Sequence, residues 1–167
     1  KCMKHLLFLI LLLGVPISSK ANDLSQIDRS FIIRQEGIIL YPYRDIGGLR
    51  TLCVGHLVGP GEEIKSHYTM EECLDIFEQD LALMVIENRT CLHREQTDNQ
   101  FTSVVDFQFN LGTTNACSST LYHNINDGLP VVQRNYTNWG NVRIHGKLQP
   151  NTSLMNRRIR EYNLYEQ

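Results

Sequence analysis

The chain has 167 residues, of which 42% are hydrophobic, and this length and composition suit one domain with a single sizeable core. Once residues 1–21 are set aside, 13 Lys and Arg stand against 18 Asp and Glu, a net charge of about −5. This acidic balance disfavours nucleic-acid binding, which depends on basic residues that neutralise phosphates. It also removes the long-range attraction that a basic protein has for an anionic polymer.

The first 21 residues have the pattern of an export signal. A basic start precedes the apolar run 6–13, and Ser19-Lys20-Ala21 forms a small-x-small cleavage site. We therefore predict a signal peptide at residues 1–21, a mature domain at 22–167, and export to the periplasm or beyond. The alternative is an uncleaved or slowly released signal anchor. The short apolar run and Pro16 argue against a stable membrane span, which needs roughly 20 apolar residues.

The segment after the signal predicts a helix followed by a small sheet. Helical spacing of apolar residues over 27–32 and a terminating Gly37 indicate a helix that ends at Glu36. Residues 40–54 are rich in β-branched and aromatic side chains, and Gly47-Gly48 interrupts them as a turn. We expect an antiparallel hairpin here.

The remainder of the chain predicts helices. Thr69-x-x-Glu72 and Thr97-x-x-Gln100 are capping boxes, and the second helix runs to Gly112. In the first helix, one side carries Cys73, Leu74, Phe77, Leu81 and Met84. Shorter helices are expected at about 119–126 before Gly128, from Pro130 to Trp139, and at about 153–165. The fold class is therefore α+β, with a small sheet lobe, a larger helical lobe and a cleft between them.

Three polar residues in the glycine-punctuated segment 36–56 could carry out glycoside chemistry. Cleavage of a glycosidic bond needs a protonated carboxyl as acid and an ionised carboxyl as its partner. Glu36 at a helix C-terminus, near the apolar residues 38–40, suits the acid, because both surroundings disfavour its charged form. Asp45 suits the partner. Thr51, on the returning strand, can help Asp45 hold a water, which favours an inverting reaction.

The spacing of Glu36-Gly37, Tyr43-x-Asp45, Thr51 and Gly55-His56 closely resembles that of the phage-type lysozymes, the muramidase family of tailed-phage endolysins. Further agreement lies in residues 68–81, 107–112 and 118–121, and in Leu154, Arg157, Arg158, Glu161 and Leu164, so that the resemblance covers nearly all of the chain after residue 30. The sequence departs from the family pattern at Arg50 and at 151–153, where a glycine is expected before Leu154.

The resemblance implies a lysozyme-like fold in which Glu36, Asp45 and Thr51 are catalytic. It implies a muramidase that acts on peptidoglycan without a metal or an organic cofactor, and we expect a monomer. Two alternatives remain: a lytic transglycosylase, which needs the acid but no water-holding pair, and a catalytically idle protein that binds peptidoglycan or acts as an inhibitor on the same scaffold.

Four cysteines follow the signal, an even number that indicates disulfides in an exported protein. Of the three possible connectivities, the resemblance implies Cys53 with Cys73 and Cys91 with Cys117. Free buried thiols are one alternative. A zinc site at Cys53-x-x-His56 is a weak second alternative, because no further ligand pair has finger spacing.

Six other residues have less specific interpretations. Asn110 is a candidate for contacting a sugar N-acetyl group across the cleft, or equally for capping its helix. His56 is interpreted as structural, paired with a carboxylate of the helical lobe. Arg157, Arg158 and Glu161 are interpreted as a charge pair on the surface rather than a wall-binding patch. The single tryptophan, Trp139, is expected in the core, with sugar stacking as its alternative.

Overall fold

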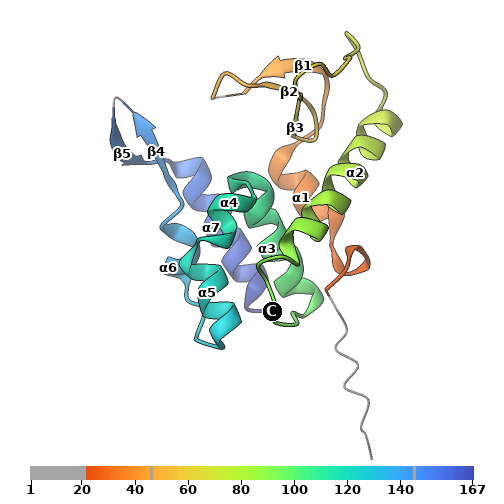
Figure 1. The fold of residues 1–167 in the computed structure, drawn as a ribbon. Helices are drawn as coiled ribbons and strands as arrows, with labels where there is room; N and C mark the ends of the chain where they lie inside the picture. Colours follow the sequence, from red (N-terminus) through yellow and green to blue (C-terminus); the bar gives the residue numbers. More distant parts are fainter. Residues whose placement is uncertain (1–21, 46, 145) are drawn as a thin grey trace, which may run out of the picture.

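The computed structural model describes residues 22–45, 47–144 and 146–167, which form a sheet lobe and a larger helical lobe (Figure 1). The elements in chain order are η1 (Leu24–Gln26), α1 (Arg29–Glu36), β1 (Ile39–Arg44), β2 (Arg50–Cys53), β3 (His56–Leu57), α2 (Met70–Asn88), α3 (Asp98–Leu111), α4 (Thr113–Cys117), α5 (Thr120–Asp127), α6 (Gln133–Thr137), β4 (Asn141–Ile144), β5 (Lys147–Pro150) and α7 (Thr152–Tyr165). This α+β arrangement confirms the predicted fold class.

The sheet lobe is an antiparallel sheet in the order β1-β2-β3. Tyr43 pairs with Thr51, and the Asp45 N–H donates to the Leu49 carbonyl across the turn. Side chains alternate between the two faces of a strand. The side chains of the cross-strand pair Tyr43 and Thr51 therefore lie on the same face of the β1–β2 ladder, and Asp45 follows β1 in the turn.

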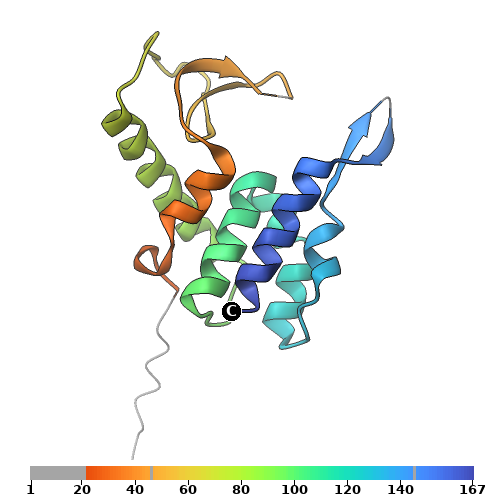
Figure 2. The ribbon, with the colours of Figure 1, turned by 180° about the vertical axis from the view of Figure 1, so that it is seen from behind.

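The core of the helical lobe surrounds α3, which packs against α7 and α2 (Figure 2). Every residue of α3 from Phe101 to Gln108 is buried. The Phe107 ring meets Tyr136 and Trp139 edge-on, with centroid distances of 5.4 and 6.1 Å. Trp139 thus packs against the core, as predicted. A smaller apolar cluster ties the sheet lobe to the start of α2 through Leu52, Cys53, Tyr68 and Cys73.

Both predicted capping boxes are present. The Thr69 hydroxyl accepts the N–H of Glu72, whose carboxylate accepts the N–H of Thr69. Thr97 and Gln100 repeat this exchange at the start of α3. Each box satisfies N–H groups that have no partner within the first turn of a helix. The sequence therefore sets the start of both long helices.

Two local expectations were wrong, and one hairpin was not predicted. The helix expected from Pro130 to Trp139 is only α6, because Val132 is still extended and the chain turns after Thr137. Residues 141–150 form an unpredicted hairpin, β4–β5, which projects at the same end of the molecule as the sheet lobe (Figure 1). Leu74 was expected on the core side of α2 but is exposed, whereas Val85, near the C-terminal end of the same helix, is buried.

The predicted disulfide pairing is confirmed. Cys53 is bonded to Cys73, and Cys91 to Cys117. The first bond joins the end of β2 to the first turn of α2, and the second joins the segment after α2 to the end of α4. Because the Cys53 sulfur is in a disulfide, the zinc alternative at this position is wrong.

The expected signal peptide, residues 1–21, lies outside the described residues. Within residues 22–45, 47–144 and 146–167, no helix combines the length and the apolar character that crossing a bilayer requires.

Candidate active site

Glu36 is the last residue of α1. Gly37 ends the helix with a φ of 75°, and its N–H donates to the Ile33 carbonyl at 2.8 Å. The Glu36 side chain is 17% exposed, and its Oε1 lies 2.6 Å from Nη1 of Arg157 on α7. Burial raises the pKa of Glu36 above its ordinary value, although the Arg157 guanidinium opposes that shift. This carboxyl therefore keeps its proton to a higher pH than an exposed glutamate does.

Asp45 and Thr51 lie across the β1–β2 turn from each other. Asp45 Oδ1 accepts the Leu49 N–H at 2.8 Å, so Asp45 does bond the turn that follows it. The hydroxyl of the buried Thr51 donates to the Leu49 carbonyl at 3.2 Å. Thr51 is paired with Tyr43, two residues before Asp45, so Asp45 and Thr51 belong to the same end of the hairpin.

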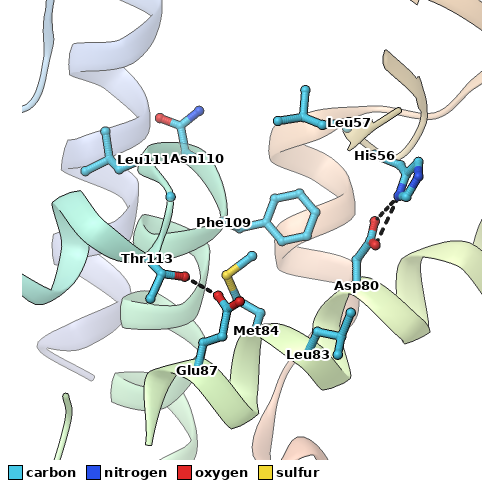
Figure 3. A pocket seen from close by; sticks show the side chains of 12 residues that line it. His56, Leu57, Asp80, Leu83, Met84, Glu87, Phe109, Asn110, Leu111 and Thr113 are labelled. Atoms are coloured by element: carbon cyan, nitrogen blue, oxygen red, sulfur yellow. Dashed lines mark hydrogen bonds and ion pairs between the residues drawn. The ribbon is translucent and has the colours of Figure 1, made fainter. Parts of the chain in front are cut away.

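A cavity of about 450 Å³ opens between the lobes, as expected for the cleft (Figure 3). Its walls come from Gly55, His56, Leu57, Asp80, Leu83, Met84, Glu87, Phe109, Asn110, Leu111, Gly112 and Thr113. Phe109 points into its centre (Figure 3). Gly55 links this cavity to Glu36, because a Cβ on Gly55 would lie 3.2 Å from Glu36 Oε2. The buried carboxyl therefore lies next to the wall of the cleft.

The Phage lysozyme family profile matches residues 33–161, which include this carboxyl, the hairpin and the cavity. The chain belongs to the phage lysozyme family.

Curated relatives and solved structures agree with this assignment. The chain is 35% identical over 103 residues to the SAR-endolysin of Escherichia phage Mu, a match that covers 62% of this chain and 59% of the Mu protein. It is 29% identical over 138 residues to the endolysin of Acyrthosiphon pisum secondary endosymbiont phage 1, covering 81% of this chain and 92% of that protein. The match therefore spans less than two thirds of the Mu relative's own length.

Two solved structures share the fold. The endolysin from Escherichia coli O157:H7 phage FAHEc1 superposes with a TM-score of 0.73 at 27% identity, over 81% of this chain and 88% of that one. The muramidase domain of SpmX from Asticaccaulis excentricus reaches a TM-score of 0.75 at 22% identity, over 87% and 97%. At the second identity the likeness concerns the fold alone.

His56 of this phage lysozyme has the structural role that was predicted. Its Nδ1 lies 2.9 Å from Asp80 Oδ2 on α2, and its Nε2 lies 3.0 Å from Glu62 Oε1. Burial opposes the charged imidazolium, but the hydrogen bonds and charges of Asp80 and Glu62 outweigh burial and raise the pKa of His56. The ring therefore ties the sheet lobe to α2, and it keeps its proton to a higher pH than a free imidazole does.

Asn110 lies in the cavity wall, at the last turn of α3 (Figure 3). Its Oδ1 accepts a hydrogen bond from Nη2 of Arg158 at 3.1 Å. Among the described residues, no hydrogen bond links its side chain to the backbone of its own helix, so the capping interpretation has no support. The carboxamide is instead held in place at the cleft by a buried guanidinium.

The interpretation of Arg157, Arg158 and Glu161 as a surface pair was wrong. The side chains of Arg158 and Glu161 are 0% exposed and that of Arg157 is 7% exposed. The i,i+3 and i,i+4 spacing brings them together as expected, but α7 turns this face towards α3. There Asp106, also 0% exposed, lies 2.7 Å from Arg157 Nη2.

Sequence reasoning missed Tyr43 and the close contact at Gly55. Burial raises the pKa of the Tyr43 phenol, and the nearby negative charges of Glu36 and Asp45 raise it further, so Tyr43 is close enough to both carboxyls to feel their charges. The cross-strand pairing of Tyr43 with Thr51 could have been predicted from a hairpin centred on Gly47-Gly48. The contact of Gly55 with Glu36 could not, because it depends on how β3 packs against α1.

Proposed function

We propose that this phage lysozyme is an exported muramidase, which hydrolyses the β-1,4 bond between N-acetylmuramic acid and N-acetylglucosamine in peptidoglycan. Membership of the family and the relatives named as endolysins support a peptidoglycan-lytic role. The observation that carries the proposal is Glu36, a largely buried carboxyl with a raised pKa beside the cleft wall at Gly55. A carboxyl that retains its proton can serve as a general acid.

In the proposed reaction, Glu36 donates its proton to the glycosidic oxygen as the bond to the anomeric carbon breaks. The Asp45 carboxylate takes a proton from a water molecule on the opposite face of the ring, and the oxygen of that water forms the new bond. Thr51 helps to hold the water, and Asn110 contacts an N-acetyl group of the substrate. Their nearness in the hairpin, where Thr51 pairs with Tyr43 two residues before Asp45, supports the water-holding role. Such a reaction inverts the anomeric configuration and needs carboxyls roughly 6.5 to 9.5 Å apart.

A turbidity assay on bacteria stripped of their outer membrane tests the activity. We expect the protein to clear the suspension and Glu36→Gln to abolish clearing while it keeps the wild-type melting temperature, since the amide preserves shape but cannot donate the proton. Glu95→Gln, at an exposed carboxyl outside the cleft, is the matched control and should remain fully active. More than a few percent of residual lysis in Glu36→Gln would remove Glu36 as the acid. If the wild-type protein binds to sacculi but does not clear the suspension, the result would favour the alternative of a catalytically idle protein that binds peptidoglycan.

The chemistry of the products separates hydrolysis from transglycosylation. A lytic transglycosylase leaves anhydro ends on its muropeptides, whereas a hydrolase leaves reducing ends, and mass spectrometry distinguishes the two. Proton NMR of the first products tests inversion: we expect the α anomer first and the β anomer only through mutarotation. Initial β product would overturn the water-holding role of Asp45 and Thr51.

Export through residues 1–21 is part of the proposal. Relatives named SAR-endolysins, a name that refers to a signal-anchor-release segment, favour the anchor as a second candidate beside cleavage after Ala21. Intact mass of the periplasmic protein decides between them. A chain that begins at Asn22 supports cleavage, and one that retains the apolar run supports the anchor.

A further inference from the structure

Behind Glu36 lies a buried charge cluster made of Glu36, Asp106, Arg157, Arg158 and Glu161. The side chains of Asp106, Arg158 and Glu161 are fully buried, and those of Arg157 and Glu36 are 7% and 17% exposed. Asp106 comes from α3, Glu36 from α1 and the other three residues from α7. The cluster therefore connects the central helices of the fold (Figure 2) to the carboxyl at the cleft.

Arg157 is the centre of this cluster. Its Nη1 lies 2.6 Å from Glu36 Oε1, and its Nη2 and Nε lie 2.7 and 3.2 Å from the two oxygens of Asp106. The same Nε lies 3.3 Å from Glu161 Oε1, which also accepts from Arg158 Nη2 at 2.5 Å. The Ser103 hydroxyl donates to the Glu161 backbone carbonyl at 2.7 Å. Glu161 thus fixes both guanidiniums at the side opposite Glu36.

The charges of the cluster do not balance when all its members are ionised. Three carboxyls face two guanidiniums, and arginine stays protonated in proteins. An uncompensated charge is costly in a buried site, so the cluster favours holding one proton on a carboxyl. Asp106 accepts two side-chain hydrogen bonds from Arg157, whereas Glu36 and Glu161 each meet Arg157 through one oxygen, at 2.6 and 3.3 Å. Glu36 and Glu161 are therefore the carboxyls that Arg157 holds less firmly, and we take them as the holders of the proton.

We propose that Glu161 is a positioning residue that holds Arg157 against Glu36 and shares the single proton of the cluster with Glu36. When Glu161 is ionised, its charge balances the guanidiniums and Glu36 keeps the proton. When Glu161 is protonated, Arg157 holds Glu36 ionised. Glu161 therefore sets the fraction of Glu36 that is ready to act as the acid, and this inference rests on the proposed role of Glu36.

Titratable and charged groups from α3, α5, α6 and α7 surround Glu161. Asp106 faces it from α3, Arg157 and Arg158 from α7, and the phenols of Tyr122 and Tyr136 from α5 and α6. Burial raises the pKa of both phenols, so they stay neutral. Burial also raises the pKa of Glu161 and of Glu36, in agreement with a proton that either can hold.

An NMR titration of the carboxyl carbons tests the sharing without reference to lysis. In the wild-type protein, the Cδ signals of Glu36 and Glu161 should each titrate in two steps, at the same two pH values, as expected of coupled sites. Glu36→Gln and Glu161→Gln assign the two signals. Independent single-step titrations of the two carbons in the wild-type chain, once the variants have assigned the signals, would overturn the proposal.

The pH profile of lysis provides the functional test. Glu161→Gln keeps the shape of the side chain but removes its charge, so Arg157 should then hold Glu36 ionised. The alkaline limb of the pH profile, where lysis falls as Glu36 loses its proton, should therefore move down by about one pH unit. Glu166→Gln, at an exposed carboxyl just beyond α7, should leave the limb unchanged. A folded Glu161→Gln with the wild-type limb would refute the proposal. If Glu36→Gln remains lytic, the proposed function fails, yet the titration still decides whether the proton is shared.

Discussion

Reduction of the two disulfides should destabilise the domain by an amount that follows from their loops. The bonds Cys53–Cys73 and Cys91–Cys117 close loops with sequence separations of 20 and 26. The chain-entropy relation then assigns about 3 to 4 kcal/mol to each bond at 25 °C. In a domain of this size each kcal/mol shifts the melting temperature by roughly 3 °C, so one bond corresponds to roughly 10 °C.

Two paired variants separate the contributions. Cys53→Ser with Cys73→Ser, and Cys91→Ser with Cys117→Ser, should lose similar stability because their loops are similar in length. Only the first pair should also lose lysis at temperatures well below melting. Cys53 has a φ of 55°, a conformation that non-glycine residues rarely adopt, and the disulfide holds it two residues before Gly55.

Calorimetry with and without reductant measures the stability, with free thiols counted to verify reduction. An unchanged melting temperature in fully reduced protein would refute the entropic reasoning. An equal loss of lysis in both paired variants, measured well below their melting temperatures, would refute the assignment of the first bond to the site.

Two further predictions concern the contacts at the cleft. Gly55→Ala should abolish most lysis, because the new Cβ would lie 3.2 Å from Glu36 Oε2. Gly61→Ala is the control: Gly61 has a similar positive φ but lies in open space, so this variant should lose only stability, about 1 to 2 kcal/mol. Equal activity of the two variants in the turbidity assay would contradict this prediction. Asp80→Asn should lower the melting temperature most near about pH 6. Because the pKa of His56 is raised on folding, its contribution is present below its unfolded pKa of about 6.5 and disappears as the pH rises through the folded value.

The control for the histidine prediction is Glu78→Gln on the same helix. Glu78 pairs with Arg29 in an ion pair that contains no histidine, so the effect of Glu78→Gln on the melting temperature should stay constant from about pH 6 to 9. If the change in melting temperature caused by Asp80→Asn is also independent of pH over this range, the imidazolium does not contribute to the stability of the pair.

The sequence predicted features whose causes are local. The capping boxes at Thr69 and Thr97 and the terminator Gly37 each act within one helical turn, and all three lie where expected. The motif from Glu36 to His56 likewise lies in one continuous segment, so its helix-then-hairpin arrangement could be predicted. The pairing of His56 with a helical-lobe carboxylate was also anticipated, although not which one.

Features that depend on distant contacts were not predicted. Arg157 and Asp106 are 51 residues apart in sequence, and charged residues at i,i+4 spacing look the same whether their helix face meets solvent or a second helix. The burial of Glu161 has the same cause. The β4–β5 hairpin was missed for a different reason: residues 141–150 contain no strong turn pair such as Asn-Gly, and they follow a helix-like stretch.

The two ends of the described chain both lie on the side of the molecule away from the sheet lobe and the β4–β5 hairpin (Figure 1). Asn22 is anchored there: its Nδ2 donates to the Arg94 carbonyl, its Oδ1 accepts from the Gln96 N–H, and its own carbonyl accepts from Arg89 Nε. A tether attached at Asn22 therefore leaves the domain from a fixed point behind the cleft. If the domain were held on a surface by either end, its cleft would face away from that surface. The distance that the domain could reach from its attachment point would increase by at most about 3.5 Å for each residue of tether.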